Sequence, residues 1–145
     1  MTVSKFSISL MPNVISEIEA RAHATGGERS ATINRMIDRY TTLLNDSRRH
    51  LREILTDAEI GLVLDVFNGT LFAEPFSIQL VAKEIEDSLV DGYAEKWKCD
   101  GPELVHKLNG LSYADQVALV DAVERWWNRV SAGESKLKPA EALKR

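Results

Sequence analysis

Polar and apolar residues alternate strictly near the start of the chain, in the segment Lys5-Phe6-Ser7-Ile8-Ser9-Leu10. A period of two is typical of a β-strand that buries one face. No other segment shows this pattern convincingly, and a single strand leaves its backbone hydrogen-bonding groups unpaired. We therefore predict that this strand pairs with the same strand of a second copy, which gives an antiparallel ribbon with two-fold symmetry.

Two helices are expected after the strand. Pro12 closes the strand and is suited to the first turn of a helix. Apolar residues then recur at helical spacing up to the Gly26-Gly27 pair, at Ile15, Ile18 and Ala22. The second helix is predicted to begin at Ser30, a good N-cap residue, and its apolar face contains Ile33, Met36, Ile37, Tyr40 and Leu44. The pattern lapses at Asn45-Asp46-Ser47, so we predict a domain boundary there and a short connection from Arg48.

A separate helical domain is predicted over residues 51–130. Thr56 and Glu59 have the spacing of a capping box, which marks the start of a helix that ends at Asn68-Gly69. A longer helix is expected over 77–97, because its apolar residues keep a single stripe.

The end of this domain has equally local signals. Asp100-Gly101-Pro102 interrupts the helical pattern before a short helix that stops at Asn109-Gly110. Ser112 is the expected cap of a last helix that runs to Val130. Residues 131–145 are expected to form a flexible tail because they have little apolar content. The fold class predicted is mainly α.

Charge is distributed unevenly along the 145 residues, whose formal net charge is −4. Residues 1–52 carry eight Lys/Arg and five Asp/Glu, whereas residues 53–130 carry six basic and fifteen acidic side chains. A basic head and an acidic body suggest that one part of the protein meets phosphate groups and the other does not.

The chain shows no sign of a membrane or secretory protein. No apolar run approaches the roughly 20 residues needed to cross a bilayer, and the N-terminus lacks the layout of a signal peptide. The single cysteine, Cys99, is consistent with a reducing compartment. We expect a cytoplasmic protein with no membrane contact.

The N-terminal elements, taken in order, resemble the ribbon-helix-helix repressors, the fold of the Arc, methionine and CopG-type regulators. The resemblance covers about residues 3–44 and includes the alternating strand, the helix from Pro12, the glycine break and Arg29-Ser30-Ala31-Thr32-Ile33-Asn34-Arg35. It implies a homodimer whose ribbon lies in the major groove of double-stranded DNA, where Lys and Ser side chains can pair with base edges. It also implies that the N-terminus of the second helix holds a phosphate, a role that suits the free amides there.

Three groups of residues follow from this interpretation. The predicted base-reading residues are Lys5, Ser7 and Ser9. The predicted phosphate-binding residues are Arg29, Ser30 and Ala31. The predicted dimer core contains Phe6, Ile8, Leu10, Ile33 and Ile37. Two alternatives stay open: the polar strand face is merely solvated, or Arg29 is an ordinary surface residue.

The last predicted helix is apolar on two sides. One side carries Leu119, Val123, Trp126 and Val130, with Trp127 adjacent. Aromatic residues of this kind are enriched at protein interfaces, so this side is a candidate partner interface. The alternative is a helix buried centrally in its own domain, because four helices need a central element.

We expect neither catalysis nor a bound cofactor or metal. His23, His50, His106 and Cys99 lack the close spacing of a preformed metal site. No nucleophile–base motif or phosphate-binding glycine loop is present, and acidic runs such as Glu84-Ile85-Glu86-Asp87 are usually exposed helix faces.

The function predicted is that of a sequence-specific transcriptional repressor or autoregulator, associated with a plasmid or phage. It would occupy its operator as a homodimer, and the helical domain would form a higher oligomer or bind an effector. The alternative is a DNA-binding adaptor, either an antitoxin or a plasmid relaxosome or partition accessory protein. In that case the helical domain would hold a protein partner.

Overall fold

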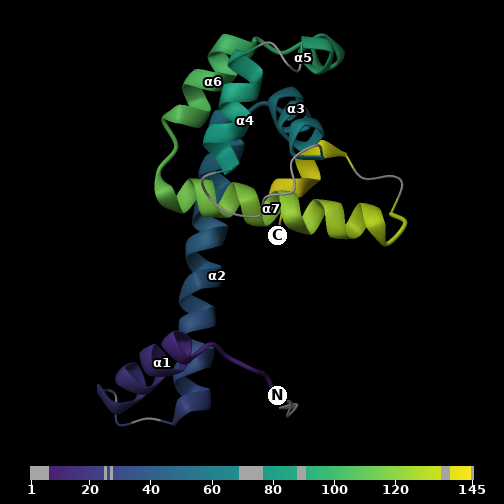
Figure 1. Ribbon diagram of the computed structural model, residues 1–145. Helices are drawn as coiled ribbons and strands as arrows, with labels where there is room; N and C mark the ends of the chain where they lie inside the picture. Colours follow the sequence, from purple (N-terminus) through teal and green to yellow (C-terminus); the bar gives the residue numbers. More distant parts are fainter. Residues whose placement is uncertain are drawn as a thin grey trace. The chain divides into compact units, whose positions relative to one another are not determined.

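The computed structural model describes residues 7–24, 26, 28–68, 77–87, 91–134 and 138–144, and this part of the chain is mainly helical, as predicted. The elements are α1 (Pro12–Ala24), α2 (Arg29–Ile54), α3 (Asp57–Asn68), α4 (Ser77–Glu86), α5 (Asp91–Trp97), α6 (Gly101–Asn109), α7 (Tyr113–Ser131) and the 3-10 helix η1 (Pro139–Leu143) (Figure 1). The chain divides into two compact units, Met1–Thr41 and Thr42–Arg145, named below the N-terminal unit and the C-terminal unit.

The predicted N-terminal strand is not formed in the part of it that the structure describes. Ser7–Leu10 has no regular secondary structure, and Lys5 and Phe6 lie outside the described residues. An intermolecular ribbon takes its backbone partners from a second copy, so one chain by itself cannot make it. The ribbon therefore stays a prediction.

The two helices of the N-terminal unit begin close to the predicted positions. Helix α1 starts at Pro12, and Gly26 follows its end with a positive φ of 61°, a conformation that suits glycine. Gly27 lies outside the described residues. Helix α2 starts one residue before Ser30, because the carbonyl of Glu28 accepts from the amide of Thr32 at 3.1 Å. Ser30 thus lies in the first turn, and it is not the N-cap that we predicted.

Helix α2 does not stop near residue 47, where we predicted a domain boundary, but continues to Ile54. The pattern lapses there because two polar residues, Ser47 and Arg48, take buried positions. Arg48 forms an ion pair with Asp121 of α7, so its charge is satisfied inside the C-terminal unit. The apolar residues Leu44 and Leu51 continue the buried side of the helix.

Helix α3 is the central element of the C-terminal unit. Apolar residues around most of its circumference are buried: Ile60, Leu62, Val63, Leu64, Val66 and Phe67. It contacts α4, α5, α7 and η1, while α4 and α6 lie side by side (Figure 1). The capping box at its start is confirmed, since Thr56 N donates to Glu59 Oε2 at 2.8 Å and Glu59 N donates to Thr56 Oγ1 at 3.2 Å. The expected end at Asn68 is also observed, and Gly69 lies outside the described residues.

Residues 77–97 do not form the single helix that we predicted. They contain two helices: α4 ends at Glu86, and α5 begins at Asp91. Helix α4 packs mainly on α6 and also contacts α3 and α7, whereas α5 packs on α3. One helix cannot follow two partners in this way, so tertiary packing overrides a continuous apolar stripe.

The last two helices begin and end as predicted. The Asp100 side chain caps α6 by accepting from Glu103 N at 3.0 Å, and Gly110 follows the last residue of that helix. The Ser112 hydroxyl caps α7 by accepting from Asp115 N at 3.2 Å.

The C-terminal segment differs from the flexible tail that we predicted for 131–145. Residues Pro139–Leu143 form η1, and the Leu143 side chain is fully buried. Arg52 of α2 also donates from Nη1 to the Leu143 carbonyl at 2.9 Å. Two apolar residues, Ala142 and Leu143, are thus enough to hold this segment on α3 and α7, although its composition is polar.

Candidate functional site

The N-terminal unit leaves most of its apolar residues uncovered. Among its described residues, only Ile18 and Ala22 are buried hydrophobic side chains. Large apolar side chains are instead exposed at Ile8, Met11, Val14, Ile15, Ile37 and Tyr40. Two of these exposed residues, Ile8 and Ile15, line one apolar hollow, and adjoining exposed apolar side chains are typical of interfaces.

The residues predicted for the dimer core lie on or beside this surface. Ile8 is 56% exposed and Ile37 is 57% exposed, whereas Leu10 and Ile33 are half-buried. Three of them, Ile8, Leu10 and Ile33, line an apolar hollow of about 200 Å³. The rest of its lining comes from Ile15, Ile18 and Arg29. Phe6, the remaining member of the predicted core, lies outside the described residues.

The predicted DNA-contacting residues are exposed where they are described. Ser7, Ser9, Arg29 and Ser30 are exposed, and Ala31 is half-buried. Lys5 lies outside the described residues. The Arg29 guanidinium forms an ion pair with Glu19 of α1, although its side chain is 70% exposed. A DNA phosphate at Arg29 would therefore compete with an existing carboxylate partner.

The candidate partner interface on α7 is part of the hydrophobic core of the C-terminal unit, so we correct this prediction. Leu119, Val123 and Trp126 are buried, at 1%, 6% and 8% exposure, and Val130 is half-buried against the same core. The alternative interpretation, a central helix inside its own unit, is the one that fits. Helix α7 is apolar on two sides because it faces α3 and α4 as well as η1.

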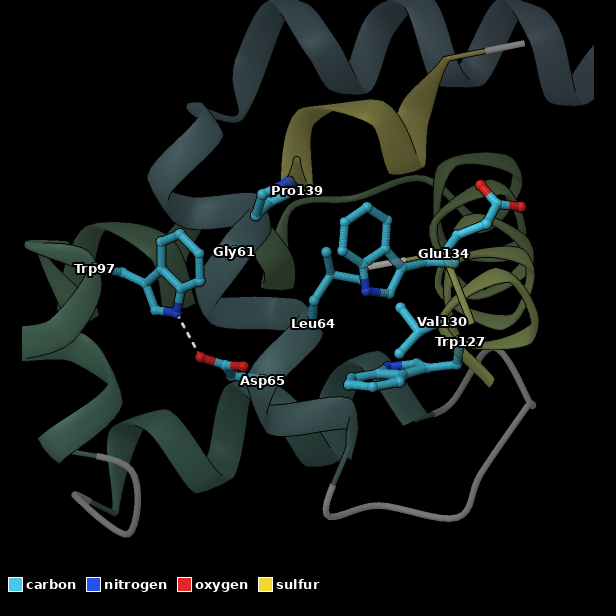
Figure 2. A pocket seen from close by; sticks show the side chains of 9 residues that line it. Gly61, Leu64, Asp65, Trp97, Trp127, Val130, Glu134 and Pro139 are labelled. Carbon is cyan, nitrogen blue, oxygen red and sulfur yellow. Dashed lines mark hydrogen bonds between the residues drawn. The ribbon is translucent and has the colours of Figure 1, made fainter. Parts of the chain in front are cut away.

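The C-terminal unit contains a hollow of about 290 Å³ that sequence reasoning did not anticipate. All three tryptophans of the chain, Trp97, Trp126 and Trp127, contribute to its wall. Figure 2 shows the side chains that line it: Gly61, Leu64, Asp65, Trp97, Trp126, Trp127, Val130, Glu134 and Pro139. The adjacent tryptophans Trp126 and Trp127 were the only sign of this hollow that the sequence offered. The sequence did not indicate that Trp97 lies close to them.

Hydrogen bonds hold one wall of this tryptophan hollow in place. Asp65 of α3 accepts from Trp97 Nε1 at 2.6 Å, the bond drawn in Figure 2, and from Lys96 Nζ at 2.8 Å. The ammonium group of Lys96 lies 5.2 Å from the centroid of the Trp97 ring. The indole nitrogen of Trp127 is buried away from solvent and has no hydrogen-bond partner among the described residues.

Both carboxylates that line the hollow are already paired. Asp65 pairs with Lys96, and Glu134 pairs with Arg129 at 2.7 Å. The hydrogen bond from Arg129 lowers the pKa of Glu134, so this carboxylate is ionised at neutral pH. The lining thus carries two acidic groups whose charges are both balanced locally.

The described part of the chain has no group of three or more His, Cys, Asp or Glu residues placed to hold a metal ion. His50 instead pairs with the buried Asp115, whose Oδ2 lies 2.9 Å from His50 Nδ1. Burial raises the pKa of the Cys99 thiol, and the negative charge of Glu59 raises it further, so the thiol is protonated at neutral pH. No helix among the described residues has the length and apolar content to span a membrane.

Comparison with known proteins found no protein-family model, no characterised protein and no solved structure that matches this chain.

Proposed function

We propose that the chain is a DNA-binding regulator that works as a homodimer through its N-terminal unit, with a ribbon-helix-helix arrangement at residues 1–47. The observation that carries this proposal is the uncovered apolar surface of the N-terminal unit, on which Ile8 and Ile37 are more than half exposed. In a two-fold dimer, each copy of this unit would cover the apolar surface of the other. Such dimers are the commonest symmetric assembly.

The order of elements supports the DNA-binding part of the proposal. A non-helical segment with Ser7 and Ser9 exposed precedes α1, and a helix N-terminus with an exposed Ser30 follows at α2. When two copies pair the segment as strands, one face carries the apolar residues and the other carries the polar ones. That polar ribbon face has the size of a reader of the major groove.

Charge supports the same division of labour. The N-terminal unit carries five Lys/Arg and four Asp/Glu, whereas the C-terminal unit carries thirteen basic and eighteen acidic side chains. Nonspecific attraction to DNA depends on cations near the phosphates, so the N-terminal unit is the part that would approach DNA. The predicted repressor or autoregulator role follows from occupancy of an operator by such a dimer.

The adaptor alternative loses one candidate surface for its protein partner. Leu119, Val123 and Trp126 are core residues of the C-terminal unit, so they do not offer a protein partner an exposed apolar site. We therefore retain a regulator of transcription as the single proposal and do not propose an antitoxin or relaxosome role.

The direct test is operator binding by a variant with Ser7→Ala and Ser9→Ala together. Footprinting on DNA upstream of the chain's own gene would first define the site, and binding would then be compared with unrelated DNA at one fixed salt concentration. We expect the variant to lose about tenfold or more of its preference for the site, since each specific base contact contributes about 1–3 kcal/mol.

The matched control is Ser131→Ala, which changes an exposed serine of α7 and should leave the preference unchanged. Dimerisation should be the same in both variants, because the serines lie on the polar face. Full retention of specificity in the double variant would rule out base reading by this segment.

A further inference from the structure

The first turn of α2 carries a positive charge where a helix disfavours one. Arg29 is the first residue of α2, and the three residues that follow it, Ser30, Ala31 and Thr32, are uncharged. The N-terminal end of a helix has a partial positive charge, so anions are favourable there and cations are favourable at the opposite end. Helix stability therefore does not explain Arg29, whereas an anion held beside this helix start would explain it.

Glu19 of α1 supplies such an anion. The Arg29 guanidinium donates from Nη2 to Oε1 of Glu19, which lies ten positions earlier in the chain. Both side chains are open to solvent, since Arg29 is 70% exposed and Glu19 is 49% exposed. Exposed ion pairs contribute little to stability because water solvates both charges when they separate. The pair is therefore accessible to a competing anion and easily opened by one.

A DNA phosphate is the competing anion that the proposed function brings to this helix start. Glu19 opposes it in two ways. Its carboxylate occupies the guanidinium of Arg29, and its negative charge repels phosphate oxygens that approach the same group. Glu28, the exposed residue before α2, adds to this repulsion. Attraction of a phosphate to this helix start thus depends on whether Arg29 is released from Glu19.

We propose that Glu19 is an intramolecular competitor of DNA, whose carboxylate takes the place of a phosphate oxygen at Arg29 and so weakens binding to DNA of any sequence. The inference rests on the proposed DNA-binding function and names a residue that sets its affinity. Glu19 is a positioning residue, since it acts through Arg29 and does not touch DNA. Weak attraction to phosphates leaves the choice of site to base contacts.

The test measures binding of the full chain to a duplex of unrelated sequence at a series of salt concentrations. Each phosphate that a cation neutralises steepens the dependence of log K on log salt concentration by about 0.9. Glu19→Gln frees one Arg29 in each copy, so the slope of a dimer should become steeper by about one to two. Affinity at low salt should rise about two- to twentyfold, as expected when two exposed ion pairs no longer compete with DNA.

Glu17→Gln is the matched control. Glu17 also lies on α1, is 54% exposed and pairs with Arg21 of the same helix at 2.6 Å, so this variant makes the same change of charge without releasing Arg29. Its salt slope should equal that of the unchanged protein. When Arg29→Gln is already present, adding Glu19→Gln should no longer steepen the slope. This comparison separates the release of Arg29 from a general loss of negative charge.

A structural role of the Glu19–Arg29 pair would appear in stability, and we expect Glu19→Gln to keep the urea denaturation midpoint of the unchanged protein. An unchanged salt slope in Glu19→Gln would overturn the inference and leave the proposed function standing. The same holds if Glu17→Gln steepens the slope equally, or if the steepening persists beside Arg29→Gln. If the unchanged protein does not bind duplex DNA at all, the inference and the proposed function both fail.

Discussion

Gly61 and Trp97 approach so closely that a Cβ atom at position 61 would lie 2.6 Å from Cε3 and Cζ3 of the indole ring. The ring cannot move aside freely, because its nitrogen donates to Asp65 on the same helix as Gly61. Glycine is a poor helix former, so its place in the middle of α3 has a packing reason: it lets α5 lie directly on α3.

Gly61→Ala should therefore destabilise the C-terminal unit, although alanine favours helix formation. The expected loss is about 1–2 kcal/mol, since overpacking costs about 1–3 kcal/mol and the gain in helix propensity returns up to about 1 kcal/mol. Urea unfolding followed by tryptophan fluorescence would measure it. Gly92→Ala is the control. Gly92 also lies in a helix, and a Cβ there would have no described atom within 4 Å, so this variant should be neutral or slightly stabilising.

Lys107 and Glu59 form a partly buried ion pair in the C-terminal unit. Lys107 Nζ lies 2.8 Å and 2.9 Å from the two carboxylate oxygens of Glu59, whose side chain is 7% exposed. Lys107→Met would leave this carboxylate without its cation, and we expect a loss of about 2–3 kcal/mol at neutral pH. Adding Glu59→Gln should recover part of that loss, and Lys83→Met, at an exposed lysine of α4, should change stability by less than about 0.5 kcal/mol.

The same pair gives a prediction for alkaline pH. The hydrogen bond with Glu59 raises the pKa of Lys107 above its ordinary value of 10.5. A group whose pKa is raised in the folded state stabilises that state fully below its unfolded pKa, and the stabilisation declines as pH rises through the folded value. The stability difference between Lys107→Met and the unchanged protein should be constant up to about pH 10 and shrink above it. A constant difference at higher pH would contradict this account.

Leu143 tests whether the C-terminal segment is part of the core. Its side chain is fully buried, and Leu143→Ala should lower the free energy of unfolding by about 2–5 kcal/mol. Lys144→Ala, at the exposed neighbouring position, should have little effect. Equal denaturation midpoints for the two variants would show that η1 does not stabilise the fold.

Ile37 tests the proposed dimer surface. Because the side chain is 57% exposed in the single chain, Ile37→Asp should hardly change the stability of one copy. In a dimer it would bury an unpaired charge, so the dimer dissociation constant should rise about tenfold or more. Sedimentation velocity over a range of concentrations would measure this. Asn34→Asp introduces the same charge at an exposed polar position of α2 and is the control; an unchanged dissociation constant for Ile37→Asp would exclude this surface.

Several helix starts in this protein follow from neighbouring residues and were therefore predictable from sequence, although the predicted cap of α2 at Ser30 was wrong. Pro12 at the start of α1, the Thr56–Glu59 capping box and the Ser112 cap of α7 all lie where we expected them. Each signal acts over three or four residues, through a fixed backbone angle or a side-chain-to-backbone hydrogen bond, and distant parts of the chain do not change it.

The length of α2, the division of residues 77–97 and the tryptophan hollow depend on contacts between distant parts of the chain, so only the tertiary structure decided them. Helix α2 continues past residue 47 because Arg48 forms an ion pair with Asp121 of α7, 73 residues away. Residues 77–97 divide because α4 packs mainly on α6, whereas α5 packs on α3. The tryptophan hollow likewise needs Trp97 to reach Asp65 and Gly61 of α3. Periodicity reports which side of a helix is apolar, but the partner of that side is chosen by packing across the whole unit.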